Sequence, residues 1–253
     1  MSCFINNILN EIKSLNQNKY DMEILKKLNK EIKKFKVKLK FEYYNKSPFN
    51  EKDNEVISII INYVNMFENY RSKIFILSSL GVEGFYQAIP YIVSIYKSFV
   101  SDIYEKPMDE ILLLHICDTI SKIKSKEHIN LYKELLNLPV TPSIVSIINM
   151  IDIMKLTELD EDVFNLIEKE NKIPNLWVGE LNETDKYWVS QTALEYISNK
   201  NDKNYYYYLK KFLNPEKLEW IVFSKSKYQK INYIDCYKKY VDIAKKGISR
   251  LDV

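Results

Sequence analysis

The stretch VSQTALEYISNKNDKNYYYYLKKFL, residues 189–213, decides how this chain folds. Apolar side chains recur in its first half at the spacing of one α-helical face: Val189, Thr192, Ala193, Tyr196 and Ile197. After a polar turn at 198–203 the same spacing returns in Tyr205, Tyr208, Leu209, Phe212 and Leu213. Four consecutive tyrosines have strand propensity, but the helical spacing continues through Phe212. The stretch therefore predicts two helices joined by a short turn.

The same two-helix pattern recurs three times upstream. The first helices are predicted to end near Leu80, Ile120, Met154 and Ile197. The apolar face of each second helix then contains Tyr91, Leu131, Phe164 and Tyr208. Prolines lie between the pairs, where helices must stop, at Pro139, Pro142, Pro174 and Pro215. Asp160 and Asn204 are predicted to cap the second helix of their pairs.

The recurring helix pairs resemble the HEAT and armadillo-like repeat families, over roughly residues 70–214. The resemblance implies an all-α protein, built as a right-handed stack of antiparallel helix pairs (an α-solenoid) with flanking helices at both ends. The intervals between the first-helix ends are uneven, and the connection from Asn171 to Lys186 is long. A non-repeating helical bundle therefore remains open.

Both ends of the chain carry Lys-rich helical patterns. The N-terminal apolar seam contains Leu25, Leu28, Ile32, Phe35 and Leu39, and the C-terminal seam contains Ile234, Tyr237, Val241, Ala244 and Ile248. Terminal units of a helical stack need a polar outer face. We therefore expect basic helical caps at 1–50 and 215–253 around repeats at 51–214, forming one continuous structural unit.

Composition restricts the fold and the compartment. The chain has 4 Gly, whereas average usage would give roughly 18, which argues against phosphate-binding loops and β-sandwiches and favours glycine-poor turns. Three cysteines at unrelated spacings predict no disulfide framework. The first residues lack the basic and apolar regions of a signal peptide, and no apolar run is long enough for a membrane span. We expect a cytoplasmic protein.

Charge is strongly segregated along the chain. The net charge is +6 over residues 1–46, −8 over 109–199 and +7 over 200–253. Within the acidic middle, four acids cluster at Glu158, Asp160, Glu161 and Asp162. Such a run either forms a solvated helix start that complements the helix dipole or attracts a basic partner. We name these four residues as candidate partner-binding residues.

Trp177 is the fifth candidate partner-binding residue. It lies in the long connection 171–186, and interface hot spots favour tryptophan. The same side chain could equally fold back over the adjoining helices, so both interpretations stay open.

The residues provide no recognisable catalytic or metal-binding pattern. In the cluster His115-Ile-Cys-Asp118, the imidazole and the thiol are two residues apart and diverge on a helix. We expect Cys117 in the core and His115 at the surface or in a helix contact, with no metal and no cofactor. A Cys–His pair assembled in space stays open, although nothing local favours it.

We therefore expect a non-catalytic protein-binding scaffold. Small helical-repeat proteins resemble some immunity proteins that block toxins, and the acidic middle would suit a basic toxin. The alternative is a nucleic-acid-binding protein, such as the HEAT-like glycosylases for alkylated DNA bases, although the chain has only two arginines. Membrane-surface binding through a Lys-rich helix at 22–44 is a weaker third hypothesis. The oligomeric state stays open.

Overall fold

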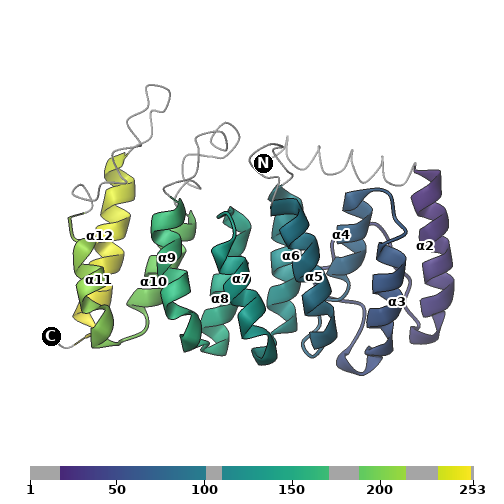
Figure 1. The fold of residues 1–253 in the computed structure, drawn as a ribbon, viewed down its shortest axis with the longest axis horizontal. Coiled ribbons are helices and arrows are strands. Elements are labelled where there is room, and N and C mark those ends of the chain that lie inside the picture. Colours follow the sequence, from purple (N-terminus) through teal and green to yellow (C-terminus); the bar gives the residue numbers. More distant parts are fainter. Residues whose placement is uncertain (1–17, 101–109, 171–187, 215–232, 252–253) are drawn as a thin grey trace. The chain divides into compact units, whose positions relative to one another are not determined.

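The chain is helical wherever the structure describes it. The structure is a computed structural model, and it describes residues 18–100, 110–170, 188–214 and 233–251. Within these ranges the regular elements are α-helices and short 3-10 helices, without any strand (Figure 1). The prediction of an all-α protein is confirmed for this part of the chain. No helix in these ranges is long and apolar enough to cross a membrane.

The described residues form two compact units. Unit 1 holds residues 18–99 and 110–131, and unit 2 holds Val100 together with the described residues from 132 onward. Helix α7 (Ile129–Asn137) crosses from the first unit into the second. The boundaries of these two units differ from those of the predicted caps at 1–50 and 215–253 and the predicted repeats at 51–214. The division into caps and repeats therefore stays a prediction.

Unit 1 is built from helices that follow one another closely in the sequence. Its α-helices are α2 (Lys19–Glu31), α3 (Glu55–Val64), α4 (Tyr70–Ser78), α5 (Ile89–Val100) and α6 (Glu110–Ile123). Its 3-10 helices are η1 (Ile32–Phe35), η2 (Glu51–Asp53), η3 (Tyr86–Ala88) and η4 (Lys126–His128). Helix α3 packs against α2 and α4, and α4 packs against α6. The first helices of the two predicted pairs are therefore neighbours.

Unit 2 is organised around α10 (Trp188–Ser198). Its other α-helices after α7 are α8 (Val145–Met154), α9 (Asp160–Glu170), α11 (Tyr206–Lys211) and α12 (Tyr233–Ser249). Its 3-10 helices are η5 (Pro142–Ile144), η6 (Thr157–Leu159) and η8 (Lys203–Tyr205). Helix α10 packs against α8, α9 and α12, and α11 packs against α12. A regular right-handed solenoid stays a prediction.

Each predicted helix pair is joined by the same local structure. One residue of each connection has a positive φ: Gly84 (101°), Lys124 (54°), Lys155 (57°) and Asn201 (54°). A 3-10 helix (η3, η4, η6 or η8) then leads directly into the second helix (α5, α7, α9 or α11). Three of the four left-handed residues carry a side chain, at a cost of about 1–2 kcal/mol each. The expected glycine-poor turns are confirmed.

The N-terminal helix is shorter than its apolar spacing predicts. It continues from α2 into η1 and ends at Phe35, because Lys36 takes φ 59°. Leu39 nevertheless reaches the core from the irregular segment that follows. Its N–H donates to Asn29 Oδ1 at 2.6 Å, and its carbonyl accepts from Asn29 Nδ2 at 3.0 Å. The expectation of one helix across 22–44 was therefore wrong.

A buried carboxylate attaches α2 to the start of α4. The Asp21 side chain is fully buried and accepts from the backbone N–H groups of Glu68 (2.9 Å) and Asn69 (3.3 Å). The hydroxyl of Ser72 donates to the same carboxylate at 2.6 Å. Because buried carboxylates need such donors, Asp21 fixes where these two helices meet.

The C-terminal helix buries a face that is rotated from the predicted one. Ala244 is buried as predicted, Val241 and Ile248 are only half-buried, and the predicted positions Ile234 and Tyr237 lie outside the residues whose side chains the structure describes. The other buried positions are Tyr240, Ile243 and Gly247 in α12 and Leu251, two residues after its end. A Cβ at Gly247 would lie 2.8 Å from Ser198 Cβ and 2.8 Å from Leu209 Cδ1. The close approach of α12 to α10 and α11 selects this face.

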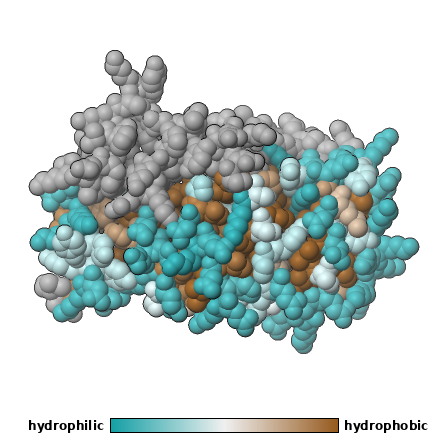
Figure 2. Space-filling model, in the orientation of Figure 1, coloured by the Kyte–Doolittle hydropathy of each residue, from teal (hydrophilic) through white to brown (hydrophobic). Residues whose placement is uncertain are grey.

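Hydrophobic side chains fill the interior of each unit. The largest fully buried ones include Tyr96, Phe67 and Phe85 in unit 1, and Tyr132 and Tyr240 in unit 2. On the face shown in Figure 2, hydrophobic groups are visible between hydrophilic ones. The part of this face that is coloured therefore exposes residues of both kinds.

Replacing Lys155 by Gly tests the cost of the left-handed turn. We expect Lys155→Gly to raise the free energy of unfolding by about 0.5–1 kcal/mol, because glycine adopts positive φ without a Cβ clash. Urea unfolding followed by circular dichroism measures it. As a control, Lys245→Gly changes an exposed lysine in regular helix and should lower the same free energy by about 1 kcal/mol. Equal losses in both variants would contradict the prediction.

Candidate functional site

The acidic run at the start of α9 divides into two outward and two inward side chains. Glu158 and Glu161 are exposed, whereas Asp160 and Asp162 are 7% and 8% exposed. Positions three apart lie on the same side of a helix, so both glutamates share one face. Two of the four candidate partner-binding acids, Asp160 and Asp162, are therefore buried, and this part of the prediction is corrected. Only Glu158 and Glu161 are accessible to a partner.

Asp160 is the centre of a buried polar network. Its Oδ1 accepts a short hydrogen bond from the Tyr196 hydroxyl, and its Oδ2 accepts from the Tyr205 hydroxyl at 2.8 Å. The ammonium of Lys200 lies 2.7 Å from Oδ1 and 4.1 Å from the centre of the Tyr196 ring. The network therefore joins α9 to α10 and η8.

The two tyrosines act as hydrogen-bond donors in this network. Burial, followed by the hydrogen bond to Asp160, raises the pKa of both Tyr196 and Tyr205 above the ordinary phenol value of 10.0. Both phenols therefore stay protonated around neutral pH. The arrangement supplies structural donors rather than a phenolate for catalysis.

The predicted caps also differ from those observed. Asp160 has helical backbone angles (φ −57°, ψ −43°), so it lies inside the helix instead of at an extended cap position. Asp202 takes the cap position expected for Asn204, and its side chain accepts from the N–H of Asn204 at 2.9 Å. Both corrections arise because a 3-10 turn precedes the α-helix.

Asp162 joins α9 to α7. One of its carboxylate oxygens accepts from Asn137 Nδ2 at 3.1 Å, and the other lies 3.5 Å from the ammonium of Lys133. These contacts explain why the second aspartate also points inward.

A half-buried phenylalanine on α9 and two exposed tyrosines on α11 form an aromatic cluster one helical turn from Glu161. Phe164 follows Glu161 by one helical turn, and its ring meets the Tyr208 ring of α11 edge-on at 4.4 Å. Tyr207 is 67% exposed and Tyr208 is 39% exposed. The ammonium of Lys211 lies 5.2 Å from the first of these tyrosine rings and 5.5 Å from the second. We call this surface the α9–α11 face, made of Glu158, Glu161, Phe164, Tyr207, Tyr208 and Lys211.

Packing of α11 determines which tyrosines reach this face. Leu209 and Phe212 are buried, and the Phe212 ring stacks on that of Tyr240 at 5.9 Å. These anchors leave Tyr207 outward and Tyr208 at the edge. The sequence pattern had placed Tyr208 on the inner face, which is corrected. Tyr207 falls outside the predicted stripe of Tyr205, Tyr208, Leu209, Phe212 and Leu213, and this spacing is the sequence signal that it faces outward.

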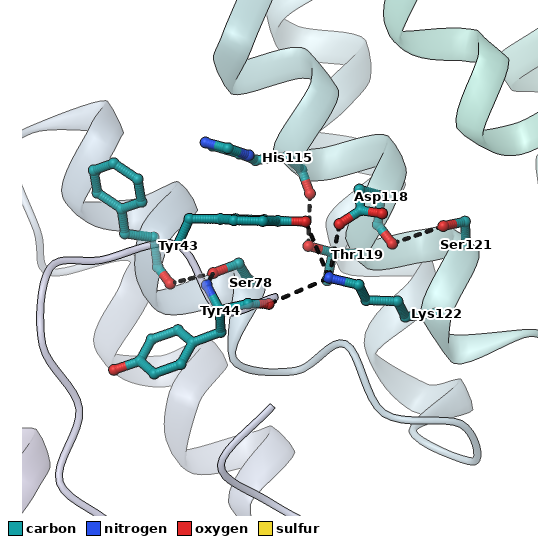
Figure 3. Close-up of polar contacts among 9 residues, drawn as sticks. Tyr43, Tyr44, Ser78, His115, Asp118, Thr119, Ser121 and Lys122 are labelled. Atoms are coloured by element: carbon teal, nitrogen blue, oxygen red, sulfur yellow. Dashed lines mark hydrogen bonds and ion pairs between the residues drawn. The ribbon is translucent and has the colours of Figure 1, made fainter. Parts of the chain in front are cut away.

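A second polar cluster lies in unit 1 around Lys122 (Figure 3). Its ammonium donates to Tyr43 Oη at 3.0 Å and to the Tyr44 carbonyl at 3.2 Å. The same ammonium pairs with Asp118 Oδ2 at 2.7 Å, one helical turn away on α6. Its three N–H groups thus have three acceptors, and the cluster holds the segment around Tyr43 against α6.

His115 is a packing residue in this cluster. Its ring stacks on Tyr43 at 4.0 Å, and burial together with the charge of Lys122 lowers the pKa of His115 to about 4. The predicted helix-contact role of His115 and the core position of Cys117 (0% exposed) both agree with the structure. Among the described residues, no group of three or more His, Cys, Asp or Glu side chains could hold a metal ion.

The remaining candidate residue lies where the structure gives no description. Trp177 belongs to residues 171–187, which fall outside the described ranges. Its two interpretations, as a partner anchor or as a plug, therefore both stay predictions.

Comparison of the chain with protein-family models, with curated proteins and with solved structures gives no match. The resemblance to HEAT and armadillo-like repeats therefore stays a resemblance of sequence pattern.

Neutralising Asp160 should destabilise unit 2. We expect Asp160→Asn to lower the free energy of unfolding by about 3 kcal/mol, because the charge of Lys200 would stay buried without its partner. Equilibrium urea unfolding measures the change. The matched control Glu161→Gln alters an exposed acid in the same helix and should shift the value by less than about 0.5 kcal/mol. Similar effects in both variants would contradict the network.

His115 should make stability depend on pH in a defined window. The unfolded imidazole, near its ordinary pKa of 6.5, binds a proton before the folded one does. Its stabilising contribution is therefore complete above pH 6.5 and is lost as pH falls towards about 4. Wild type should lose more unfolding free energy than His115→Gln over this window, measured by urea unfolding at each pH. If the two curves of unfolding free energy against pH ran parallel, the folded protein would not lower the pKa of His115, and the prediction would be wrong.

Proposed function

We propose that this protein is a non-catalytic protein-binding scaffold whose partner docks on the α9–α11 face. The observation that carries the proposal is an aromatic cluster, formed by the exposed Tyr207 and Tyr208 and the half-buried Phe164, near two exposed glutamates. Interface cores are enriched in tyrosine and phenylalanine, and their rims are polar. The α9–α11 face has aromatic side chains that suit an interface core and charged side chains that suit its rim.

Charge on the face favours a basic partner. Among the described residues, Glu158 and Glu161 have no ion pair, so both carboxylates are free to meet cationic groups. Unpaired charges at an interface rim accelerate association and select the partner. An immunity-type protein that neutralises a basic toxin is the form of this proposal that the acidic rim favours. A cytoplasmic location belongs to the same proposal.

The face is supported by a rigid base. Asp160 connects α9 to α10 and η8, and Asp162 connects α9 to α7. A surface held by buried polar contacts loses little freedom on binding, which favours affinity. The inward aspartates therefore contribute to binding through the position of α9 and do not touch the partner.

Capture experiments with paired variants test the proposal. We expect Tyr207→Ala to weaken partner capture from native lysate by about 30-fold or more, the effect of a hot-spot tyrosine. The double reversal Glu158→Lys with Glu161→Lys should also reduce capture, most strongly at low salt. Asp160 and Asp162 are left unchanged, because their reversal would disrupt the fold.

The matched control is Tyr70→Ala in unit 1. Tyr70 is 58% exposed and has a lysine ammonium 5.2 Å from its ring, as Tyr207 does. This variant should capture the partner as wild type does. Equal capture by the Tyr207 variant and wild type would rule the face out, provided that circular dichroism shows both to be folded.

A further inference from the structure

Lysine dominates one exposed segment of unit 1. Eight lysines occur between residues 26 and 40, and all eight are exposed: Lys26, Lys27, Lys30, Lys33, Lys34, Lys36, Lys38 and Lys40. Every other residue in this range is buried or half-buried, except Glu31. We call these eight residues the lysine ridge.

The helix places these lysines on one side. Ile24, Leu25, Leu28 and Ile32 are buried and form the inner face of α2 and η1. With 3.6 residues per turn, the five ridge lysines from 26 to 34 fall within an arc of about a third of the helix circumference, on the side opposite the buried residues. Their stems therefore project away from the core together.

The ridge is largely uncompensated within the chain. Among the described residues, its one ion pair joins Lys34 to Glu55 at 2.5 Å. Two acids share the outer side of α2, Glu23 and Glu31, and the second of these accepts a hydrogen bond from Tyr63. Residues 23–40 thus keep a net charge of +6. Such a density of like charge repels itself and attracts a polyanion.

The side chains of the ridge favour one kind of binding partner over the others. A membrane-surface helix inserts its apolar face, but the apolar face of α2 is already buried in unit 1. Protein interfaces are depleted in lysine and need apolar anchors, and no apolar residue from 26 to 40 is exposed. A row of compact ammonium charges instead suits phosphate groups, which lysine binds as a point charge.

We infer that the lysine ridge is a sequence-independent binding site for the phosphate backbone of a nucleic-acid duplex. From Lys26 to Lys34 the helix axis advances about 12 Å. A DNA duplex presents one charge per about 1.7 Å, or about seven charges over that length. The site is independent of the α9–α11 face, because it lies in the other unit and uses other residues.

Salt-dependent binding of a labelled duplex tests the inference. We expect wild type to bind a fluorescein-labelled DNA duplex of mixed sequence, with log affinity falling against log salt at a slope of about −4. The triple variant Lys26→Gln, Lys30→Gln and Lys33→Gln should reduce that slope by about 3 and lower affinity at least 10-fold at low salt. Fluorescence anisotropy measures both.

The control variant changes the same number of charges elsewhere. Lys203, Lys239 and Lys245 are exposed in unit 2, and their triple replacement by Gln should leave duplex affinity within about 3-fold of wild type. Equal losses in both triple variants would overturn the site, because net charge alone would then explain binding. No duplex binding at low salt would also overturn it. Binding to phosphatidylserine vesicles without duplex binding would assign the ridge to a membrane surface.

Discussion

The short connection between the two helices of each pair sets where the second helix begins. A residue with positive φ follows the first helix in each connection, and a 3-10 turn then leads directly into the second helix. Lysine or asparagine takes three of the four left-handed positions, against an intrinsic preference for glycine. Burial of the apolar faces on both sides compensates for this cost. The four connections thereby place α5, α7, α9 and α11 at their observed starting points.

Buried carboxylates then determine how neighbouring helices are oriented. Asp21 accepts from the two N–H groups just before α4 and from a serine hydroxyl within it, Asp160 accepts from two phenols, and Asp162 accepts from an amide. Apolar contacts tolerate small rotations of a helix, whereas a buried carboxylate requires its donors at fixed places. In η6 and the first turn of α9 this requirement turns both aspartates inward and leaves both glutamates outward. The accessible acidic surface is therefore a consequence of the internal network.

The two proposed binding surfaces use different physical chemistry. The α9–α11 face combines aromatic rings with charges of both signs, so binding there would gain from apolar burial as well as from charge. The lysine ridge has charge of nearly one sign and no exposed apolar residue, so its binding would be electrostatic and sensitive to salt. Each surface belongs to one unit and is built entirely from residues of that unit.

The helical content, the four helix pairs and the glycine-poor turns can be predicted from the sequence, because helical spacing and composition are local properties. The acidic run and the lysine-rich segment are also visible in the sequence as unusual. The burial of Asp160 and Asp162, the end of the N-terminal helix before Leu39 and the inward face of α12 instead depend on tertiary packing. The exposure of Tyr207 and Tyr208 on α11 likewise depends on which of its residues pack into the core. Whether a side chain is inward or exposed depends on donors and neighbours far away in the chain, such as Tyr196 for Asp160, and helical periodicity does not encode those partners.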